Sequence, residues 1–420
     1  MTKEQRLKKR YAAETRFKRY GIISICAALL FVGLLIFKVL SEGSSAFVKT
    51  SIQLELNFDH KLLNISEKPT KEEIADIDFY DFTLQHILKV YPTSNRDEEK
   101  QLIKLFTSDF EFEVKNYFLS NVSILNKIVT LNITASSDLD QLHKGNYQRN
   151  IPEERRKISN FQLAIYDQLI KNKKITKIFN NYFLTKGDSR NPEIAGIGGA
   201  MLGSFFSILV CLIISFPIAL LAAVYLEEFA PKNKFTDFIE ININNLAAVP
   251  SIVYGLLALQ ILLASLQMPR STPLVAGITL ALMTLPRIII PCRASLKAVP
   301  PSIREGALAV GASKFQSVFH HVVPLALPGT LSGTIIGLAQ ALGETAPLIL
   351  IGMVAFVVDI PSTPIDPSSS LPVQVYLWSE SAERGFVEKT SATIMMLLSF
   401  LIVMNFVAVY LRQKFEKRWN

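Results

Sequence analysis

Long runs without a charged residue constrain this chain more than any other feature of its sequence. Residues 194–226 contain no Asp, Glu, Lys or Arg over 33 positions, whereas about 20 apolar residues suffice to span a bilayer as a helix. This run must therefore cross the bilayer at a tilt, or part of it must lie at the membrane surface. With 50% hydrophobic residues and a mean hydropathy of +0.30, the chain is not an ordinary soluble protein. The runs predicted as six membrane spans are 20–37, 194–226, 241–269, 271–286, 329–358 and 390–411.

The first run has two interpretations. Residues 1–19 hold eight basic residues, and the uncharged segment 20–37 follows directly. A cleaved signal peptide is one interpretation, because Ser44-Ser45-Ala46 resembles a cleavage site. The run is longer than the roughly 7–15 apolar residues of a signal peptide, so the sequence favours a retained membrane anchor.

Basic residues in the short loops predict the orientation. Segments 1–20, 227–240, 287–320 and 412–420 hold 8, 2, 5 and 4 Lys/Arg, whereas 268–273 and 359–389 hold 1 and 2. Because short cytoplasmic loops carry the excess of Lys and Arg, both termini are predicted to be cytoplasmic. The hydrophilic block 41–193 then lies outside the membrane. The net charge of +8 comes from the N-terminal flank and does not indicate nucleic acid.

The hydrophilic block is predicted to be one α+β domain. Apolar and polar residues alternate over 51–59 and 110–115, which predicts half-buried strands, and 128–134 is a third candidate strand. Residues 72–91 and 153–183 are predicted to be helices. The basic stretch 155–177 is interpreted as a solvated helix surface rather than a binding face.

Motifs for catalysis are missing from the sequence. No G-x-x-x-x-G-K-[ST] loop for ATP and no nucleophile elbow occurs, so no enzyme activity, metal or cofactor is predicted. The three cysteines are far apart and indicate neither a disulfide framework nor a metal site. His320 and His321 are adjacent, hence on different helix faces, and are interpreted as interfacial residues.

The stretch 299–347 is predicted to be the functional centre of the chain, and 299–323 is predicted to be a cytoplasmic coupling loop within it. Residues 302–314 are charged and helix-prone, too polar for lipid, and lie between two predicted spans. Arg304 and Glu305 offer charges to a partner, and Gly311 lets the chain turn between two short helices. A polar helix-turn-helix on the ATP side of the membrane could receive a push from a soluble partner.

One acid in a predicted span also indicates function. Glu344 lies 15 residues into the run 329–358, near the middle of the predicted span. Placing a carboxylate there costs free energy, so an acid at this depth is first interpreted as a functional residue. Arg287 is the better placed of the two available cations, Arg287 and Arg293. The alternatives are that Arg287 reaches to the interface and that Glu344 only hydrogen-bonds a neighbouring helix. Pro250, Pro286 and Pro347 are predicted to kink or break spans.

Several motifs resemble those of a known transporter family. Glu305-Gly306-Ala307, then Gly311 and Pro324, resemble the "EAA" loop of ABC importer permeases, with Gly306, His321 and Val323 departing from the consensus. The motifs NPEIAGIGGAMLGS (191–204), AVYLEEFAP (223–231), NNLAAVPSIVYGLLAL (244–259) and GETAP (343–347) resemble the A-type permease of the bacterial phosphate ABC importer. The resemblance covers about residues 190–415.

This resemblance implies an all-α polytopic membrane protein with six transmembrane helices and an inserted extracytoplasmic α+β domain. The expected divisions are 1–40 for the tail and first span, 41–193 for the inserted domain and 194–415 for the permease domain. The implied partners in the bacterial inner membrane are a homologous second permease, two ATPase subunits, a periplasmic phosphate-binding protein and inorganic phosphate.

The resemblance also implies roles for individual residues. Those expected to couple to the ATPase are Arg304, Glu305, Gly306, Ala307, Gly311 and Lys314. Those expected in the translocation pathway are Arg287, Gln340, Glu344 and Thr345. Related chains often carry an arginine where this one has Gln340. Two alternatives stay open: a permease for another oxyanion or small solute, and a membrane-anchored extracytoplasmic binding or sensor protein.

Overall fold

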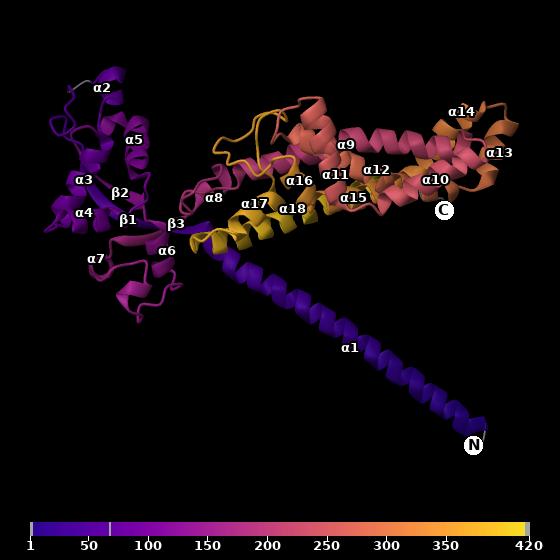
Figure 1. Cartoon of the computed structure of the whole chain (residues 1–420), viewed down its shortest axis with the longest axis horizontal. Coiled ribbons are helices and arrows are strands. Elements are labelled where there is room, and N and C mark those ends of the chain that lie inside the picture. The colour runs from indigo at the N-terminus through magenta and orange to yellow at the C-terminus, as the bar shows by residue number, and fades with distance from the viewer. Residues whose placement is uncertain (1–2, 67–68, 416–420) are drawn as a thin grey trace.

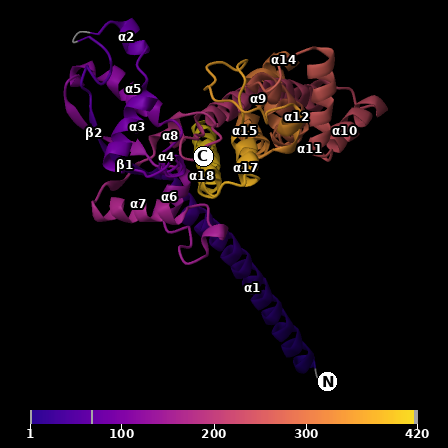
Figure 2. The ribbon, with the colours of Figure 1, turned by 60° about the vertical axis from the view of Figure 1, so that its left-hand side comes forward.

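The computed structural model describes residues 3–66 and 69–415. Figure 1 shows a mixed α/β domain, a helical bundle beside it, and helix α1 (Lys3–Gly43) running away from both. In the view of Figure 2, α1 again projects alone. The last turn of α1 packs against α18 (Gly385–Phe415), where a Cβ atom on Gly43 would lie 2.8 Å from the backbone nitrogen of Ala392. A larger residue at position 43 would therefore push α1 and α18 apart.

The mixed domain contains a three-stranded antiparallel sheet in the order β2–β1–β3. The strands are β1 (Val48–Asn57), β2 (Ile128–Thr134) and β3 (Ile175–Phe179). Leu54 of β1 pairs with Leu131 of β2, and Ile52 pairs with Ile175 of β3. From Ile52 to Asn57, alternate residues of β1 are buried, as the period of two predicts, whereas residues 49–51 are all buried. The predicted strand 128–134 is confirmed, and the strand predicted at 51–59 is present as Val48–Asn57.

The third predicted strand, 110–115, is wrong. These residues begin helix α5 (Phe110–Ser120), whose buried residues Phe110, Val114 and Phe118 recur every four positions. Phe112, which a strand would have buried beside Phe110, is 53% exposed. Over six residues the periods of a strand and a helix are hard to distinguish, and only the further apolar residue Phe118 separates them.

The two predicted helices of this domain are interrupted. Residues 72–91 form α2 (Lys71–Ala75) and α3 (Phe79–Val90), because the side chain of Asp78 caps α3 by accepting a hydrogen bond from the backbone N–H of Asp81. Residues 153–183 form α7 (Asn160–Lys171), strand β3 and α8 (Asn181–Thr185). Lys173, with φ of 53°, turns the chain between α7 and β3. The helical prediction is therefore wrong for β3.

The core of the domain lies between the sheet and its helices, which include α4 (Arg96–Ile103) and α6 (Ser137–His143). Aromatic rings occupy its centre. The ring of Phe58 lies 5.3 Å from that of Phe82 and 5.5 Å from that of Phe118. Such ring pairs stabilise a core beyond the effect of their buried area.

Within residues 3–66 and 69–415, five helical segments are long and apolar enough to cross a membrane. They are Leu7–Phe47, Gly198–Phe229, Pro273–Lys297, Lys314–Leu342 and Gly385–Lys414. A sixth candidate is the pair Lys234–Ala247 and Ser251–Ser265, which is bent by 99°. If this bent pair is counted as one span, the structure has the six spans that the sequence predicts. Its break lies at Pro250, as predicted.

Two of these segments differ from their predicted extents. Helix α12 (Pro273–Lys297) continues through Pro286, and thereby takes up Arg287 and Arg293. The predicted run 329–358 is instead split: α15 (Val323–Leu342) ends before Gly343, and the short helix α16 (Ala346–Leu350) follows. Glu344 therefore lies in a break between helices rather than inside one.

Helix α12 lies at the centre of the bundle, packed against α9 (Gly198–Val224) and α15. Small residues allow these helices to approach closely. A Cβ atom on Gly333 of α15 would lie 2.4 Å from the ring of Pro291 on α12. The remaining helices of the bundle are α10 (Lys234–Ala247), α11 (Ser251–Ala258), α13 (Pro301–Ala309), α14 (Lys314–Ser317) and α17 (Leu371–Ser379).

Candidate functional site

A helical hairpin, formed by α13 and α14, connects α12 to α15. Gly311 turns the chain with φ of +90°, a conformation that favours glycine, and its N–H donates to the carbonyl of Leu308. Ser313 then caps α14 through a capping box with Gln316. The predicted turn at Gly311 is therefore present, but only α13 is a separate short helix, because α14 continues through a π-helical turn (Val318–Val322) into α15.

Exposed apolar side chains surround the turn of this hairpin. Leu308 is 49% exposed, Val310 85% and Phe315 60%. They come from both helices and from the turn between them, so the end of the hairpin presents apolar surface away from the bundle. Apolar side chains gathered in this way are typical of a surface that docks another protein.

Arg304 fastens the hairpin to the ends of two long helices. Its Nε and Nη2 donate to Oε1 of Glu228 at 3.0 and 2.5 Å. Its Nη1 donates to the carbonyl of Val299 at 2.7 Å, and Nη2 also donates to that of Leu296 at 2.9 Å. Glu228 and two carbonyls thus occupy donors of the Arg304 guanidinium, and a contact of Arg304 with an ATPase stays a prediction.

A second arginine joins the neighbouring helix ends. Arg293 of α12 lies 3.4 Å from Glu227, in a π-helical turn (Tyr225–Phe229) after α9, and 2.7 Å from Glu240 of α10. Sequence reasoning missed this network. Its signal is the pair Glu227-Glu228, which directly follows an uncharged run and complements the basic segment 287–304.

The other residues predicted to contact an ATPase are distributed around the hairpin. Glu305 and Gly306 are exposed, and Ala307 is buried against the bundle. The ammonium group of Lys314 lies 5.2 Å from the centre of the Phe229 ring. Glu305 and Lys314 are both exposed and are therefore accessible charges of the hairpin.

Arg287 and Glu344 lie close together in the bundle. Arg287 Nη1 of α12 is 3.8 Å from Glu344 Oε1, and the side chains are 20% and 19% exposed. This distance is too long for a hydrogen bond, and Nη1 is buried without a hydrogen-bond partner among residues 3–66 and 69–415. The sequence-based choice of Arg287 over Arg293 agrees with this geometry.

The break that holds Glu344 is framed by small and cyclic residues. A Cβ atom on Gly255 of α11 would lie 2.7 Å from Cα of Pro347, at the start of α16. Thr345 is half-buried in the break, and Gln340 is exposed on the last turn of α15. Within the described part of the chain, no three His, Cys, Asp or Glu side chains gather as metal ligands.

A multi-span helical bundle that carries a fastened hairpin between two spans has the architecture of a transporter permease. Residues 215–419 match the family described as "Binding-protein-dependent transport system inner membrane component". Residues 215–419, just under half of the chain, thus form a domain similar to that family, and the chain is a multi-pass membrane permease. Residues 4–153 match a family described as a domain of unknown function, DUF3333.

Similar proteins are named as phosphate permeases. The chain is 29% identical over 231 residues to a "Phosphate transport system permease protein PstA homolog" of Mycoplasma pneumoniae, covering 53% of this chain and 35% of that protein. It is 34% identical over 160 residues to PstA 1 of Mycobacterium tuberculosis, covering 37% and 51%. It is 28% identical over 219 residues to PstA of Yersinia pestis, covering 52% and 72%. The chain thus spans about a third of the first relative and half of the second.

Proposed function

We propose that this chain is the permease subunit of an ATP-driven phosphate importer and forms half of its translocation pathway. The names of the similar proteins support phosphate as the substrate. The observation that carries the coupling is the apolar cluster of Leu308, Val310 and Phe315, exposed on a hairpin that Arg304 fastens to the bundle. A soluble ATPase that binds this cluster would transmit its own movement to the bundle through the hairpin.

The proposed complex contains a second, homologous permease, two ATPase subunits and an extracytoplasmic phosphate-binding protein. It lies in the inner membrane of a bacterium, with both termini of this chain in the cytoplasm. The distribution of Lys and Arg over the short loops supports this orientation, because it places the hairpin on the side where ATP is found.

The ion pairs of the hairpin suggest how a movement of the ATPase would be transmitted to the proposed substrate pathway. Movement of α13 pulls on Glu228 through Arg304, and α12 is tied to α9 and α10 through Arg293. Arg287 lies on the same helix as Arg293, six residues or about 9 Å earlier. A displacement of α12 therefore shifts Arg287 relative to Glu344, as alternating access requires.

The pair Arg287–Glu344 is proposed as an anion contact on the pathway. Arg287 Nη1 has no hydrogen-bond partner among the described residues, so it retains a donor for a phosphate oxygen. Glu344, at 3.8 Å, balances the charge of Arg287 while the pathway is empty. Phosphate would then compete with Glu344 for Arg287. Thr345 lies next to this pair along the chain, and Gln340 one turn before it.

Co-expression with a P-loop ATPase tests the docking surface. Val310→Asp places a charge at the most exposed apolar residue of the hairpin, and we expect the ATPase to be lost from the purified complex. Val122→Asp is the matched control, because Val122 is 39% exposed in the mixed domain, away from the hairpin. Retention of the ATPase by Val310→Asp would exclude this surface as the docking site.

Uptake measurements test the substrate separately. Radiolabelled phosphate should enter cells that express the complete complex, and unlabelled phosphate should compete at lower concentration than sulfate. Stronger competition by another anion would keep the permease and its ATPase coupling but replace the substrate. The two experiments can therefore fail independently.

A further inference from the structure

A groove of about 500 Å³ lies where the mixed domain meets the two membrane helices α1 and α18. Three segments line it: the C-terminal end of α1, helix α6 with the turn after it, and the first turn of α18. One water molecule fills about 30 Å³ of liquid volume, so the groove has room for a larger polar group. It lies apart from the hairpin and from the pair Arg287–Glu344.

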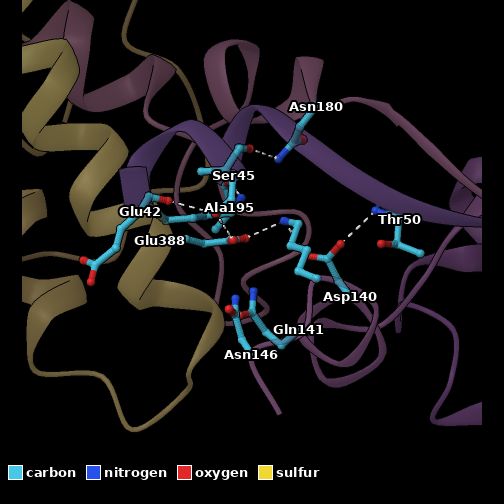
Figure 3. Close-up of polar contacts among 12 residues, drawn as sticks. Glu42, Ser45, Thr50, Asp140, Gln141, Asn146, Asn180, Ala195 and Glu388 are labelled. Carbon is cyan, nitrogen blue, oxygen red and sulfur yellow. Dashed lines mark hydrogen bonds and ion pairs between the residues drawn. The ribbon is translucent and has the colours of Figure 1, made fainter. Parts of the chain in front are cut away.

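The floor of the groove is a buried network of charges that satisfy one another. Lys144 Nζ lies 2.7 Å from Asp140 Oδ2 and 2.8 Å from Glu388 Oε1, and all three side chains are buried. The hydroxyl of Ser45 donates to Glu388 Oε2 at 2.5 Å. Figure 3 shows these contacts joining α6 to the start of α18. The floor is thus fixed, with two carboxylates sharing one ammonium group.

The wall of the groove, in contrast, contains donors that are still free. The side chain of Gln141 is only 3% exposed, and its Nε2 has no hydrogen-bond partner within the described residues. Its Oε1 already accepts from Asn146 Nδ2 at 2.7 Å, which fixes the amide. A buried donor without a partner is unfavourable, and a ligand acceptor in the groove would satisfy it.

Arg384 and Glu42 provide one charge of each sign. Arg384 is exposed and uses Nη1 to donate to the carbonyl of Asn146, while its guanidinium stacks on Tyr147 at 5.1 Å. Its fork geometry leaves further N–H groups for a phosphate. The carboxylate of Glu42 is 42% exposed and lies 3.9 Å from Lys38, so it can accept from an ammonium group.

The position of the groove relative to the bilayer narrows the choice of ligand. Both helices that enter it belong to apolar membrane-spanning segments. Phe37 and Leu40, which precede the groove on α1, are 71% and 48% exposed, and Val387 on its wall is 56% exposed. The groove is therefore continuous with surface that faces acyl chains, and its polar groups lie at the depth of lipid headgroups.

We propose that this groove binds the zwitterionic headgroup of phosphatidylethanolamine from the leaflet on the side of the mixed domain. The phosphate accepts hydrogen bonds from Gln141 and Arg384, and the ammonium donates to Glu42. Phosphatidylglycerol has no cation for Glu42, and the trimethylammonium of phosphatidylcholine has no N–H to donate. The lipid then bridges α1, the mixed domain and α18.

Native mass spectrometry of the delipidated full chain in detergent tests this site. Titration with the three phospholipids should show phosphatidylethanolamine bound about tenfold more tightly than phosphatidylglycerol or phosphatidylcholine. Arg384→Gln should weaken phosphatidylethanolamine about tenfold. Arg270→Gln, at an exposed arginine outside the groove, should leave binding unchanged. Glu42→Gln should remove the preference for phosphatidylethanolamine and leave the chain folded.

The same titration can overturn the proposal. Equal binding of the three lipids, or equal losses in Arg384→Gln and Arg270→Gln, would show that the groove does not select a headgroup. Soluble phosphoethanolamine is a further arm of the experiment. If it displaces the lipid at equal concentration, the headgroup chemistry is correct but the ligand comes from solution, and the proposed lipid is wrong.

Discussion

At the scale of single residues, two arginines of this chain differ in how completely their donors are used. Arg304 donates to Glu228 and to two carbonyls, so its charge is compensated and its geometry is fixed. Arg287 has a buried Nη1 without a hydrogen-bond partner within the described residues, and its nearest carboxylate oxygen lies 3.8 Å away. An arginine whose N–H donors are hydrogen-bonded within the protein holds two elements together. An arginine with a free N–H donor retains the capacity to bind an anion.

Arg304→Lys should weaken the attachment of the hairpin. A lysine ammonium cannot reproduce the fork that holds Glu228 and two carbonyls, so we expect the free energy of unfolding to fall by about 1–3 kcal/mol. The melting temperature in detergent measures this effect. Arg270→Lys is the control with the same change at an exposed residue. Equal melting temperatures for both variants would show that the Arg304 fork does not hold the hairpin.

Glu344→Gln tests the pathway pair under the proposed function. The amide no longer balances Arg287, so phosphate should be held more tightly and released more slowly. We expect the KM for phosphate uptake and the maximal rate both to fall, each by about tenfold. Co-purification of the ATPase should not change, which separates this effect from misfolding. Normal uptake would instead reduce Glu344 to a packing role.

At the scale of elements, local patterns could be predicted and long-range partners could not. The alternation over 51–59 predicted a strand because a half-buried strand has a period of two. The similar alternation over 110–115 was misleading, because Phe110 and Val114 also have the spacing of a helix. The hairpin at 302–314 could be predicted from its polarity between two apolar runs. The ion pair of Arg304 with Glu228 joins residues 76 positions apart, and only the fold brings them together.

Gly311→Ala and Gly306→Ala form a matched pair for the turn of the hairpin. A Cβ atom at either position would have no heavy atom within 4 Å, so only the backbone conformation distinguishes them. Gly311 has φ of +90°, where alanine is strained by about 1–2 kcal/mol, whereas alanine in helix α13 at position 306 should stabilise it by about 0.5–1 kcal/mol. Opposite shifts in melting temperature are expected. Equal shifts would show that the turn does not depend on its glycine.

At the scale of the whole molecule, the mixed domain is attached to the bundle by buried charge. Lys144, directly after α6, bridges Asp140 and Glu388, and Lys389 of α18 donates to the carbonyl of Ala195. Burial also raises the pKa of the Glu193 carboxyl in the segment between the mixed domain and α9. A domain held by side chains packed in this way follows the movement of α18, rather than swinging on a free linker.

Two lysines that bridge the same parts of the molecule allow this attachment to be tested. Lys144 and Glu388 have side chains 7% exposed, whereas Lys157 and Glu383, at 2.8 Å, are both 44% exposed. Lys144→Gln leaves two buried carboxylates without their cation and should destabilise the junction by about 3 kcal/mol. Lys157→Gln should change it by at most about 1 kcal/mol, because water already solvates both partners. Amide hydrogen exchange in α6 and in the first turns of α18 measures the difference. If both variants exchange like the original chain, the buried network does not hold the domain, and its attachment must come from the apolar contacts of α1 with α18.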